Sequence, residues 1–411
     1  MRLLDIEMDR DKNLVEVADN VKPHKQVNIH ALINRAKQLL EPFKDNYIFI
    51  RDEEQLLEYV KECEKNGIVS IDTETTGLDP MIDTLVGFSL YTPNKKACYV
   101  PVSHIFDNIN ASKEIITECL FRLSCLKVIM FNACFDIRIL NKYCGVTFNI
   151  YWDCYLGAKV LKSNEEENSL KYLWDKYCSE STDDESLKFS EIFKDMSFDI
   201  VPPKIGYIYA SKDAIITFQL YEYQKKQFYG EENRKMFNLY VDTELPLINV
   251  IVEMEDNGIG INKVKAKSLS IDYNGKLKTI ENEFYEECLK YSAKIADFIN
   301  KHPKTKLQLP ISITSPPQLS ILLYEVLGLK HSYKKEKPTS TNVKALDTLS
   351  HPIVDIILKY RSLFTLTSTF INAIPNMVNP TTNRLHCRFN QIGAETGRMS
   401  SKSPKQNWAV A

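Results

Sequence analysis

Three short apolar runs in the first quarter of the chain have the composition of β-strands. They cover residues 67–72, 85–91 and 97–102, and they are rich in β-branched and aromatic residues. Turn-forming pairs at residues 79–80 and 93–94 separate them. The pattern predicts three strands that follow one another as a meander.

The apolar positions that follow alternate between helical and strand spacing. A helix predicted over residues 112–122 leads into the apolar run 127–131 and then into a helix over 134–142. Strands followed by alternating strand and helix indicate an α/β domain with a mixed sheet. Helical periods then predominate, in the stretches 154–161, 169–178 and 207–227.

The second half of the chain has a helical pattern almost throughout. The pattern runs from residue 236 to residue 299 and is interrupted by a Lys-rich stretch near Pro303 and by the pair Pro316-Pro317. Further helices are predicted over residues 317–327, 341–349 and 352–374. The first 46 residues are polar apart from a helix-like run at 31–40, and no function is assigned to them.

The composition narrows the class of protein. Hydrophobic residues make up 44% and charged residues 26%, and no apolar run reaches the roughly 18 residues of a membrane span. The first ten residues include acidic positions where a secretory signal would have its apolar core, so we expect a cytosolic protein. Ten scattered cysteines without a Cys-x-x-Cys pair, and seven unclustered histidines, argue against disulfides and a zinc site.

The charge is distributed unevenly along the chain. Its formal value is −2, whereas nucleic-acid binders usually have a basic excess. Residues 162–199 contain eleven acidic residues and five lysines, and residues 301–337 contain seven lysines and two glutamates. Ordinary solvated surfaces would explain both stretches, but any contact with a nucleic-acid backbone is expected in the second.

Asp72 and Glu74 are the most informative residues, in the segment Ser-Ile-Asp-Thr-Glu-Thr-Thr-Gly. Side chains alternate along a strand, so carboxylates at i and i+2 point to one face. Two acids on a buried strand are costly unless a cation compensates them, and such oxygen ligands suit Mg²⁺ or Mn²⁺. Alone, the pair also fits a solvated strand end.

Two further segments add acids in positions where α/β sites gather. Asp136 follows the predicted strand 127–131 at a strand-to-helix turn, where it fits either a site residue or a helix N-cap. Tyr209 and Asp213 are four residues apart and therefore share one face of a helix. The spacing of each segment is weak evidence by itself.

Together, the segments Asp72-x-Glu74, Asn132-x-x-x-Asp136 and Tyr209-x-x-x-Asp213 resemble the three exonuclease motifs of the family A DNA polymerases. The resemblance covers about residues 47–225 and includes the strand that leads to Asp153 and the helix after it. It implies an RNase H-like 3′-5′ exonuclease domain, with a mixed sheet flanked by helices, that proofreads DNA.

The resemblance also implies roles for these residues. Two metal ions, Mg²⁺ or substituting Mn²⁺, would activate water and stabilise the departing 3′ oxygen. Asp72, Glu74 and Asp213 would hold the water-activating ion, and Asp72 would bridge to a second ion held by Asp136. Tyr209 would orient the attacking water. The remaining assignments are Leu78 as a wedge against the terminal base, or else as plain core, Asn132 as a contact to the single strand, and Asp153 as a structural helix cap.

The rest of the chain resembles the polymerase part of the same family, in the order that the family uses. The segments around 244–261, 313–319, 338–342 and 360–370 resemble a mainly helical thumb, whose lysines would track a DNA duplex. The segment 391–401 resembles the opening of the palm, and there Gln391 and Arg398 are the positions expected to contact the primer-template minor groove. After Pro404 the expected pattern stops, and the palm's metal-binding aspartates are not reached.

The sequence thus predicts four parts: an N-terminal segment of unknown role (1–46), a 3′-5′ exonuclease domain (47–228), a thumb-like region (229–380) and the start of a palm (381–411). The expected partner is DNA, with a separate polypeptide as one possible source of the palm. A free-standing exonuclease acting on DNA or RNA, and a non-catalytic DNA-binding subunit, are the alternatives. The thumb-like segments argue against the first, and the full set of four acids and Tyr209 argues against the second.

Overall fold

A computed structural model describes residues 29–402, except for residues 107–108, 166, 180–191, 194–195 and 395. The chain divides into two compact units. Among the described residues, the first unit comprises residues 29–256 and 389–402, and the second comprises residues 257–388. The expected departure from the palm pattern after Pro404 lies outside the described residues. The four parts predicted from the sequence, including the thumb-like region 229–380, remain a prediction about function.

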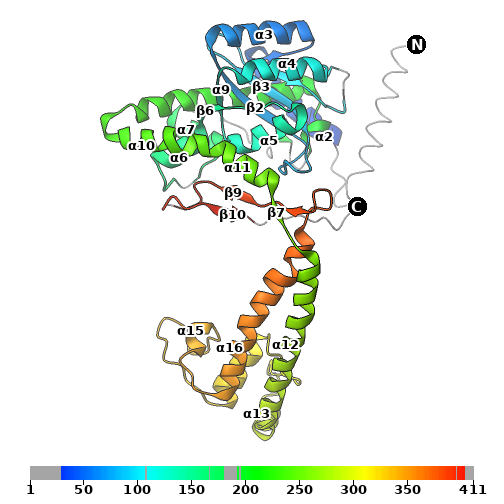
Figure 1. Cartoon of the computed structure of the whole chain (residues 1–411), viewed down its shortest axis with the longest axis vertical. Helices are drawn as coiled ribbons and strands as arrows, with labels where there is room; N and C mark the ends of the chain where they lie inside the picture. Colours follow the sequence, from blue (N-terminus) through cyan, green and yellow to red (C-terminus); the bar gives the residue numbers. More distant parts are fainter. Residues whose placement is uncertain are drawn as a thin grey trace, which may run out of the picture. The chain divides into compact units, whose positions relative to one another are not determined.

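A six-stranded mixed sheet forms the centre of the first unit (Figure 1), in the strand order β1-β4-β3-β2-β5-β6. β2 is antiparallel to β3, and β3 is antiparallel to β4, which confirms the predicted meander. β5 is parallel to both β2 and β6, and β1 is parallel to β4. The predicted α/β class is therefore confirmed. The strands are β1 (Ile48–Phe49), β2 (Ile68–Thr75), β3 (Leu85–Tyr91), β4 (Cys98–Pro101), β5 (Lys127–Met130) and β6 (Ile150–Asp153).

Helices flank this sheet. The longest, α9, packs across β2, β3, β4 and β5, while α5 contacts β2 and β3 and α4 contacts β5. The α-helices in the described part of the unit are α2 (Ile29–Leu40), α3 (Glu53–Asn66), α4 (Lys113–Ser124), α5 (Ala133–Cys144), α6 (Cys154–Leu161), α7 (Leu170–Tyr177), α9 (Pro203–Phe228), α10 (Arg234–Leu239) and α11 (Leu245–Asn257). A π-helix, η4 (Tyr240–Glu244), joins the last two, and a small separate sheet pairs β9 (Arg388–Asn390) with β10 (Ser400–Lys402).

The side chains of β2 show that α9 and α5 lie on opposite faces of the sheet. Ser70 donates a 2.6 Å hydrogen bond to the carbonyl of Ala214 on α9. Thr73 donates a 2.5 Å hydrogen bond to Asp136 on α5. Because strand side chains alternate, the even-numbered residues of β2 face α9 and the odd-numbered residues face α5.

Among the elements that were not predicted are β1 and α3 of the first unit. β1 has only two residues, which is too short for an alternating pattern. α3 begins at its N-cap residue Asp52, which accepts a hydrogen bond from Gln55, and ends at Gly67. Gly67 has a φ of 68°, in the left-handed region that favours glycine at a helix C-terminus.

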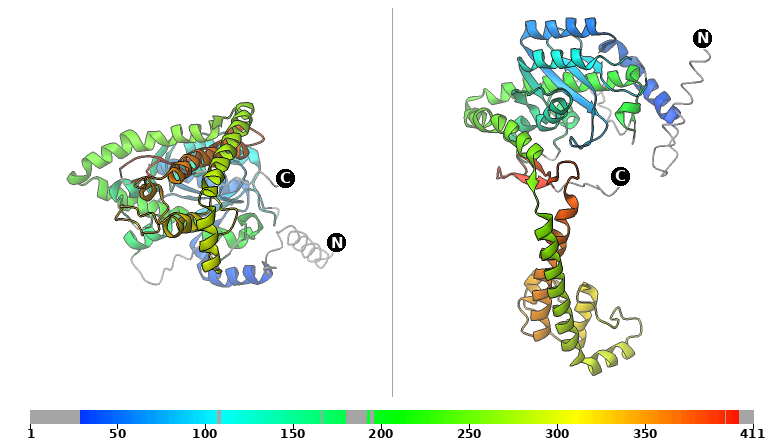
Figure 2. Two further views of the ribbon diagram at one scale, coloured as in Figure 1. Left: turned by 90° about the horizontal axis from the view of Figure 1, so that it is seen from below. Right: turned by 45° about the vertical axis from the view of Figure 1, so that its right-hand side comes forward.

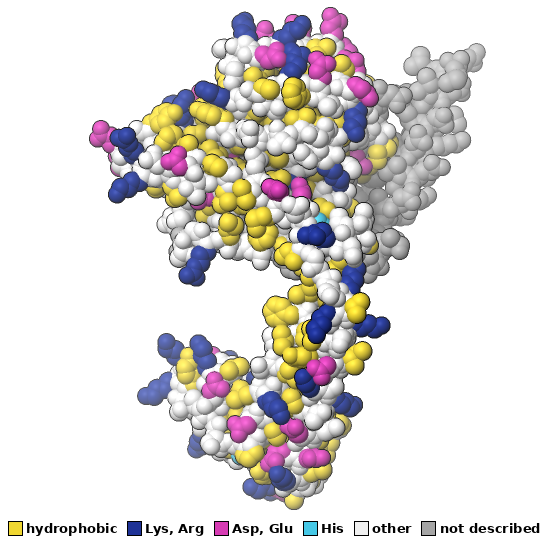
Figure 3. Space-filling model, in the orientation of Figure 1, with side chains coloured by type: hydrophobic (Ala, Val, Ile, Leu, Met, Phe, Trp, Pro, Cys, Tyr) yellow, Lys and Arg dark blue, Asp and Glu magenta, His cyan; other side chains and the backbone are white. Residues whose placement is uncertain are grey.

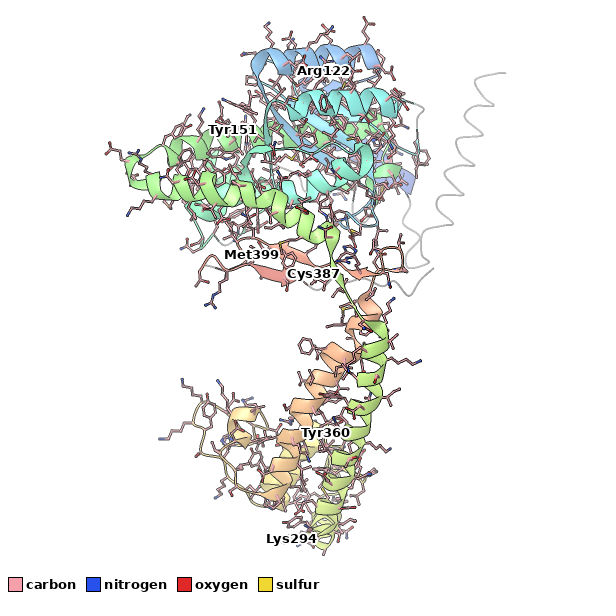
Figure 4. All side chains as sticks on the ribbon, in the orientation of Figure 1. Arg122, Tyr151, Lys294, Tyr360, Cys387 and Met399 are labelled. Carbon is pink, nitrogen blue, oxygen red and sulfur yellow. The ribbon has the colours of Figure 1, made fainter. Side chains whose placement is uncertain are left out.

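In the second unit, α12 (Lys263–Leu289) and α16 (Pro352–Thr365) pack side by side (Figure 2). Tyr360 on α16, labelled in Figure 4, lies beside an apolar core that includes Phe284. Its hydroxyl donates a 2.9 Å hydrogen bond to Glu281 on α12. The remaining elements are α13 (Ser292–Lys301), α14 (Pro316–Ser320), the π-helix η5 (Ile321–Val326), α15 (Val343–Leu346), the π-helix η6 (Leu366–Asn372), the 3-10 helix η7 (Ile374–Met377), β7 (Ile259–Gly260) and β8 (Arg384–Leu385).

The continuous helical pattern predicted from residue 236 to residue 299 is wrong at Gly258. There the backbone turns with a φ of 60°, and β7 then pairs with β8. A Cβ atom at Gly258 would lie 2.7 Å from the carbonyl oxygen of Leu385, so only glycine allows the two strands to approach this closely. The helix ends because of this pairing between distant segments, which a local pattern does not record.

Basic side chains stand on the surface of the second unit (Figure 3). The lysines of the 330–337 stretch are exposed, namely Lys330, Lys334, Lys335 and Lys337. None of the described helices is both long and apolar enough to cross a membrane.

Candidate active site

Asp72 and Glu74 lie on the face of β2 that is turned toward α9. Their side chains follow Ser70 at intervals of two residues, and Ser70 bonds to α9. β2 ends one residue after Glu74, at Thr75, and its pairing with β3 is irregular between these two residues. The two acids therefore stand near the carboxyl end of β2, where the parallel strands β5 and β6 also end.

Helix α9 brings a third acid to this face. Asp213 lies one helical turn after Tyr209, as their spacing predicts. One carboxylate oxygen from each of Asp72, Glu74 and Asp213 lies within 4.8 Å of the others. Within the described residues, these three make up the group of acids able to hold one metal ion.

The electrostatics of the cluster favour a bound cation. Burial raises the pKa of Asp72 and of Glu74 well above the ordinary range, and the charge of Asp213 raises both further. Burial also raises the pKa of Asp213, against the opposing charge of Lys171. Three carboxylates that repel one another in a partly buried site would be stabilised by a divalent ion.

One oxygen atom of the cluster is also short of a partner. Asp213 Oδ1 is buried and receives no well-formed hydrogen bond within the described part of the chain. The ammonium of Lys171 lies 3.4 Å away, beyond a good hydrogen-bond distance. Hard oxygen donors with an unsatisfied lone pair fit Mg²⁺ or Mn²⁺.

Asp136 approaches from the other side of β2. Its carboxylate accepts the hydrogen bond from Thr73, and its side chain is only 4% exposed. Burial raises the pKa of Asp136 to about 7, although the hydrogen bond from Thr73 acts in the opposite direction. Asp136 lies outside the group of three, but its charge is close enough to raise the pKa of Asp72.

The interpretation of Asp136 as a helix N-cap is wrong. Asn132 is the N-cap residue of α5, with a φ of 65°, and Asp136 lies within the first turn of the helix. The carboxylate points back to β2 and makes no cap for α5. A buried acid in this position matches a site residue better than a capping residue.

Asp153 fixes the start of α5 from the end of β6. Its carboxylate accepts hydrogen bonds from the backbone nitrogens of Asn132 at 3.2 Å and Ala133 at 2.8 Å. It also accepts from Tyr155 at 2.8 Å and Leu156 at 3.1 Å, which caps α6. The structural role expected for Asp153 is confirmed, and it extends to two helices instead of one.

Lys171 is a site residue that the sequence analysis missed. Its ammonium donates a 2.6 Å hydrogen bond to the hydroxyl of Tyr209 and lies 3.8 Å from the centre of that ring. It also pairs with Asp213, and its side chain is only 12% exposed. Lys171 belongs to no acidic motif and sits in α7, so only the packing of α7 against α9 reveals it.

Leu78 and Asn132 are exposed. Leu78 lies in the loop between β2 and β3 and is 81% exposed, so the alternative interpretation of it as plain core is wrong. Asn132 is exposed at the turn between β5 and α5. Both side chains are accessible to a bound strand, as their expected roles require.

The two palm-like positions differ in their surroundings. Arg398 is exposed. Gln391 is only 5% exposed and donates from its amide to the carbonyl oxygen of Glu244 at 2.7 Å and to its carboxylate at 2.5 Å. In this arrangement Gln391 is not accessible to DNA, and a contact there would require these hydrogen bonds to break.

Carboxylates gathered at the end of a strand in an α/β sheet suit a divalent metal ion, and comparisons with known proteins indicate the class of protein. Residues 47–228 match the family of 3′-5′ exonuclease domains, and residues 274–408 match DNA polymerase family A. Exonuclease domains of this kind depend on metal ions. The chain therefore carries a 3′-5′ exonuclease domain in its N-terminal part and a segment similar to DNA polymerase family A in its C-terminal part.

Two of the relatives are bacterial DNA polymerases. The chain is 30% identical over 368 residues to DNA polymerase I of Chloroflexus aurantiacus, and the match covers 86% of the chain and 36% of that protein. It is 29% identical over 355 residues to DNA polymerase I of Borreliella burgdorferi, with coverages of 85% and 36%. The chain therefore spans about a third of the length of these relatives.

A solved structure has the same fold. It is described as the POL domain of Pol1 from M. smegmatis in complex with DNA primer-template and dNTP, and it superimposes with a TM-score of 0.63 at 17% identity. The match covers 85% of the present chain and 54% of that structure. At this identity the similarity concerns the fold alone.

Proposed function

We propose that the chain is a proofreading 3′-5′ exonuclease that removes nucleotides from the 3′ ends of DNA with two Mg²⁺ ions, for which Mn²⁺ can substitute. The observation that carries the proposal is the convergence of Asp72, Glu74 and Asp213, whose oxygens lie within 4.8 Å of one another beside Tyr209. The family match of residues 47–228 supports it.

The proposed chemistry divides between the metal ions and the protein. When bound, the ions supply an activated water, charge neutralisation at phosphorus and stabilisation of the leaving 3′ oxygen. Asp72, Glu74 and Asp213 would hold the first ion, and Asp72 with Asp136 would hold the second. Asp136 reaches this role from the opposite face of β2, so it would act directly or through a water molecule.

Tyr209 orients the attacking water in this proposal. Its hydroxyl accepts a hydrogen bond from Lys171. Helix α9 carries both Tyr209 and Asp213, so one rigid element fixes these two side chains. A positioned hydroxyl need not ionise to contribute, because it fixes the direction of attack.

The substrate proposed is a single-stranded 3′ end of little sequence specificity. Leu78 would wedge against the terminal base, and Asn132 would contact the strand beyond it. Both are exposed on loops that leave the carboxyl ends of β2 and β5. Apolar and amide contacts of this kind do not distinguish one base from another by hydrogen-bond pattern.

We propose that the remainder of the chain holds duplex DNA and takes part in replication. The exposed lysines of the 330–337 stretch would contact the duplex backbone, and Arg398 would contact the minor groove of the duplex. Nucleotidyl transfer would additionally require palm carboxylates, carried on the same chain or on a separate polypeptide. The place of action would be the cytoplasm of a bacterium or of a phage-infected host.

A labelled-strand assay tests the proposed exonuclease. Single-stranded DNA labelled at its 5′ end should be shortened stepwise in the presence of Mg²⁺, and Asp72→Asn or Asp213→Asn should reduce the rate by at least about 100-fold. The matched control is Asp242→Asn, an exposed acid of the same unit. Degradation at the full rate by either site variant would contradict the proposal.

A further inference from the structure

The ammonium of Lys171 lies inside the acidic cluster. It is 3.4 Å from Asp213 Oδ1 and 2.6 Å from the hydroxyl of Tyr209, and the side chain is 12% exposed. Its charge opposes the rise in pKa of all three acids of the cluster, Asp72, Glu74 and Asp213. A long, strongly hydrated side chain is seldom buried to this extent unless it has partners that require its charge.

The helix that carries Lys171 is held firmly against α9. Leu173 is fully buried, and Trp174 donates a 2.5 Å hydrogen bond from its indole to Gln219 on α9. Ser169 caps the helix by accepting from the backbone of Tyr172. Lys171 is therefore delivered to the cluster by a packed element, and its position does not depend on a loose surface side chain.

The contact with Tyr209 assigns the two sides of the tyrosine hydroxyl. Because the ammonium can only donate, it occupies a lone pair of the hydroxyl oxygen. The hydrogen of the hydroxyl therefore points away from Lys171, toward an acceptor. In the proposed reaction, that acceptor is the oxygen of the attacking water.

We propose that Lys171 is a positioning residue of the nuclease site, which neutralises the carboxylates before metal binds, competes with the divalent ion for Asp213 and fixes Tyr209 as a hydrogen-bond donor to the attacking water. This inference rests on the proposed function. It assigns the ammonium of Lys171 to the site as a cation that belongs to the protein. When a metal ion binds, the ion replaces this ammonium as the positive partner of Asp213.

The test compares Lys171→Met with Lys226→Met, a control on α9 whose side chain is exposed. Without metal, Lys171→Met should melt at a lower temperature than the control, because the acids lose their counter-ion. Its affinity for Mn²⁺, measured by electron paramagnetic resonance, should be about 10-fold tighter, because the ammonium no longer competes with the ion for Asp213. A tenfold change in affinity is the free energy of about one pKa unit. Hydrolysis at saturating Mn²⁺ should be slower by about 10- to 100-fold, since Tyr209 is no longer held.

Lys171→Arg separates charge from shape. It retains a donor and a positive charge, so it should restore the melting temperature without metal and the Mn²⁺ affinity toward the wild-type values. If Lys171→Met matches the control in both quantities, the inference is wrong, even where hydrolysis slows, because a rate effect alone would make Lys171 a contact to the DNA. If the wild-type protein itself binds no Mn²⁺, the proposed function fails, and this inference fails with it.

Discussion

Thr73 on β2 donates a 2.5 Å hydrogen bond to Asp136 on α5. Thr73 lies between Asp72 and Glu74 in sequence but points to the opposite face of the strand. One strand therefore positions acids on both sides: two directly, through its even-numbered face, and a third through the hydroxyl of Thr73. The hydrogen bond explains how Asp136, an acid on helix α5, is kept at a fixed distance from Asp72 on β2.

Replacing Thr73 should change the pH dependence of hydrolysis. The hydrogen bond lowers the pKa of Asp136, so Thr73→Val should raise that pKa and leave fewer ionised carboxylates at pH 7. The acidic limb of the rate profile should move to higher pH, and the rate at pH 7 should fall by roughly 10-fold, as expected for the loss of a hydrogen bond to a charged group. Thr73→Ser, which keeps the hydroxyl, should retain the wild-type profile. An unchanged profile in the valine variant would show that Thr73 does not control Asp136.

Metal binding should depend on pH in a direction fixed by the raised pKa values. Burial raises the pKa of Asp136 to about 7, so this acid is partly protonated near neutral pH in the metal-free protein, and burial also raises the pKa values of the three clustered acids. A metal ion binds only the ionised form, so its binding should release protons and weaken as the pH falls from 8 to 6. Calorimetric titrations with Mn²⁺ in buffers of different ionisation enthalpy would measure the release. An affinity that is constant over this range would contradict the burial of these acids.

Tyr209→Phe should slow hydrolysis without weakening the binding of the substrate. The variant keeps the ring and removes only the hydroxyl, which accepts from Lys171 and in the proposed function orients the water. We expect a rate about 10- to 1,000-fold lower, the range typical of one positioning or acid-base group. The binding of a single-stranded oligonucleotide, measured with Ca²⁺ in place of Mg²⁺, should remain near the wild-type value. A loss of binding as large as the loss of rate would make Tyr209 a substrate contact.

Asp153 should matter for stability more than an ordinary helix cap. It is almost completely buried and accepts hydrogen bonds from four backbone nitrogens at the starts of α5 and α6. Asp153→Ala should lower the free energy of unfolding by about 2–4 kcal/mol, because it leaves buried donors without partners. Asp52→Ala removes a single N-cap bond at the exposed start of α3 and should cost about 1 kcal/mol. Equal losses in chemical denaturation of the two variants would show that the second helix gains nothing from Asp153.

Local rules predict which side chains share a face, and the resemblance to the exonuclease motifs joined the three segments into one site. Period two in a strand places Asp72 and Glu74 on one face, and the helical turn places Tyr209 over Asp213. The link from Thr73 to Asp136 and the entry of Lys171 were not predictable, because each depends on how a helix packs against a distant element. The buried position of Gln391 beside Glu244 is likewise a tertiary contact, formed between residues 147 positions apart.

The fold shows the same division. The meander and the mixed sheet follow from runs of apolar residues and from turns. Helix α3 was missed although its buried residues, Leu56, Tyr59, Val60 and Cys63, have helical spacing. The break at Gly258 was missed because it is imposed by the pairing of β7 with β8.

The central claim is that Asp72, Glu74 and Asp213 hold the ion that activates the attacking water. Anomalous scattering from crystals of the wild-type protein grown with Mn²⁺ and a single-stranded oligonucleotide that resists hydrolysis tests this claim directly. We predict one Mn²⁺ ligated by oxygens of all three acids and a second that shares Asp72, and Asp213→Asn should lose the first. Mn²⁺ bound elsewhere, with these three carboxylates unligated while DNA occupies the site, would contradict the account.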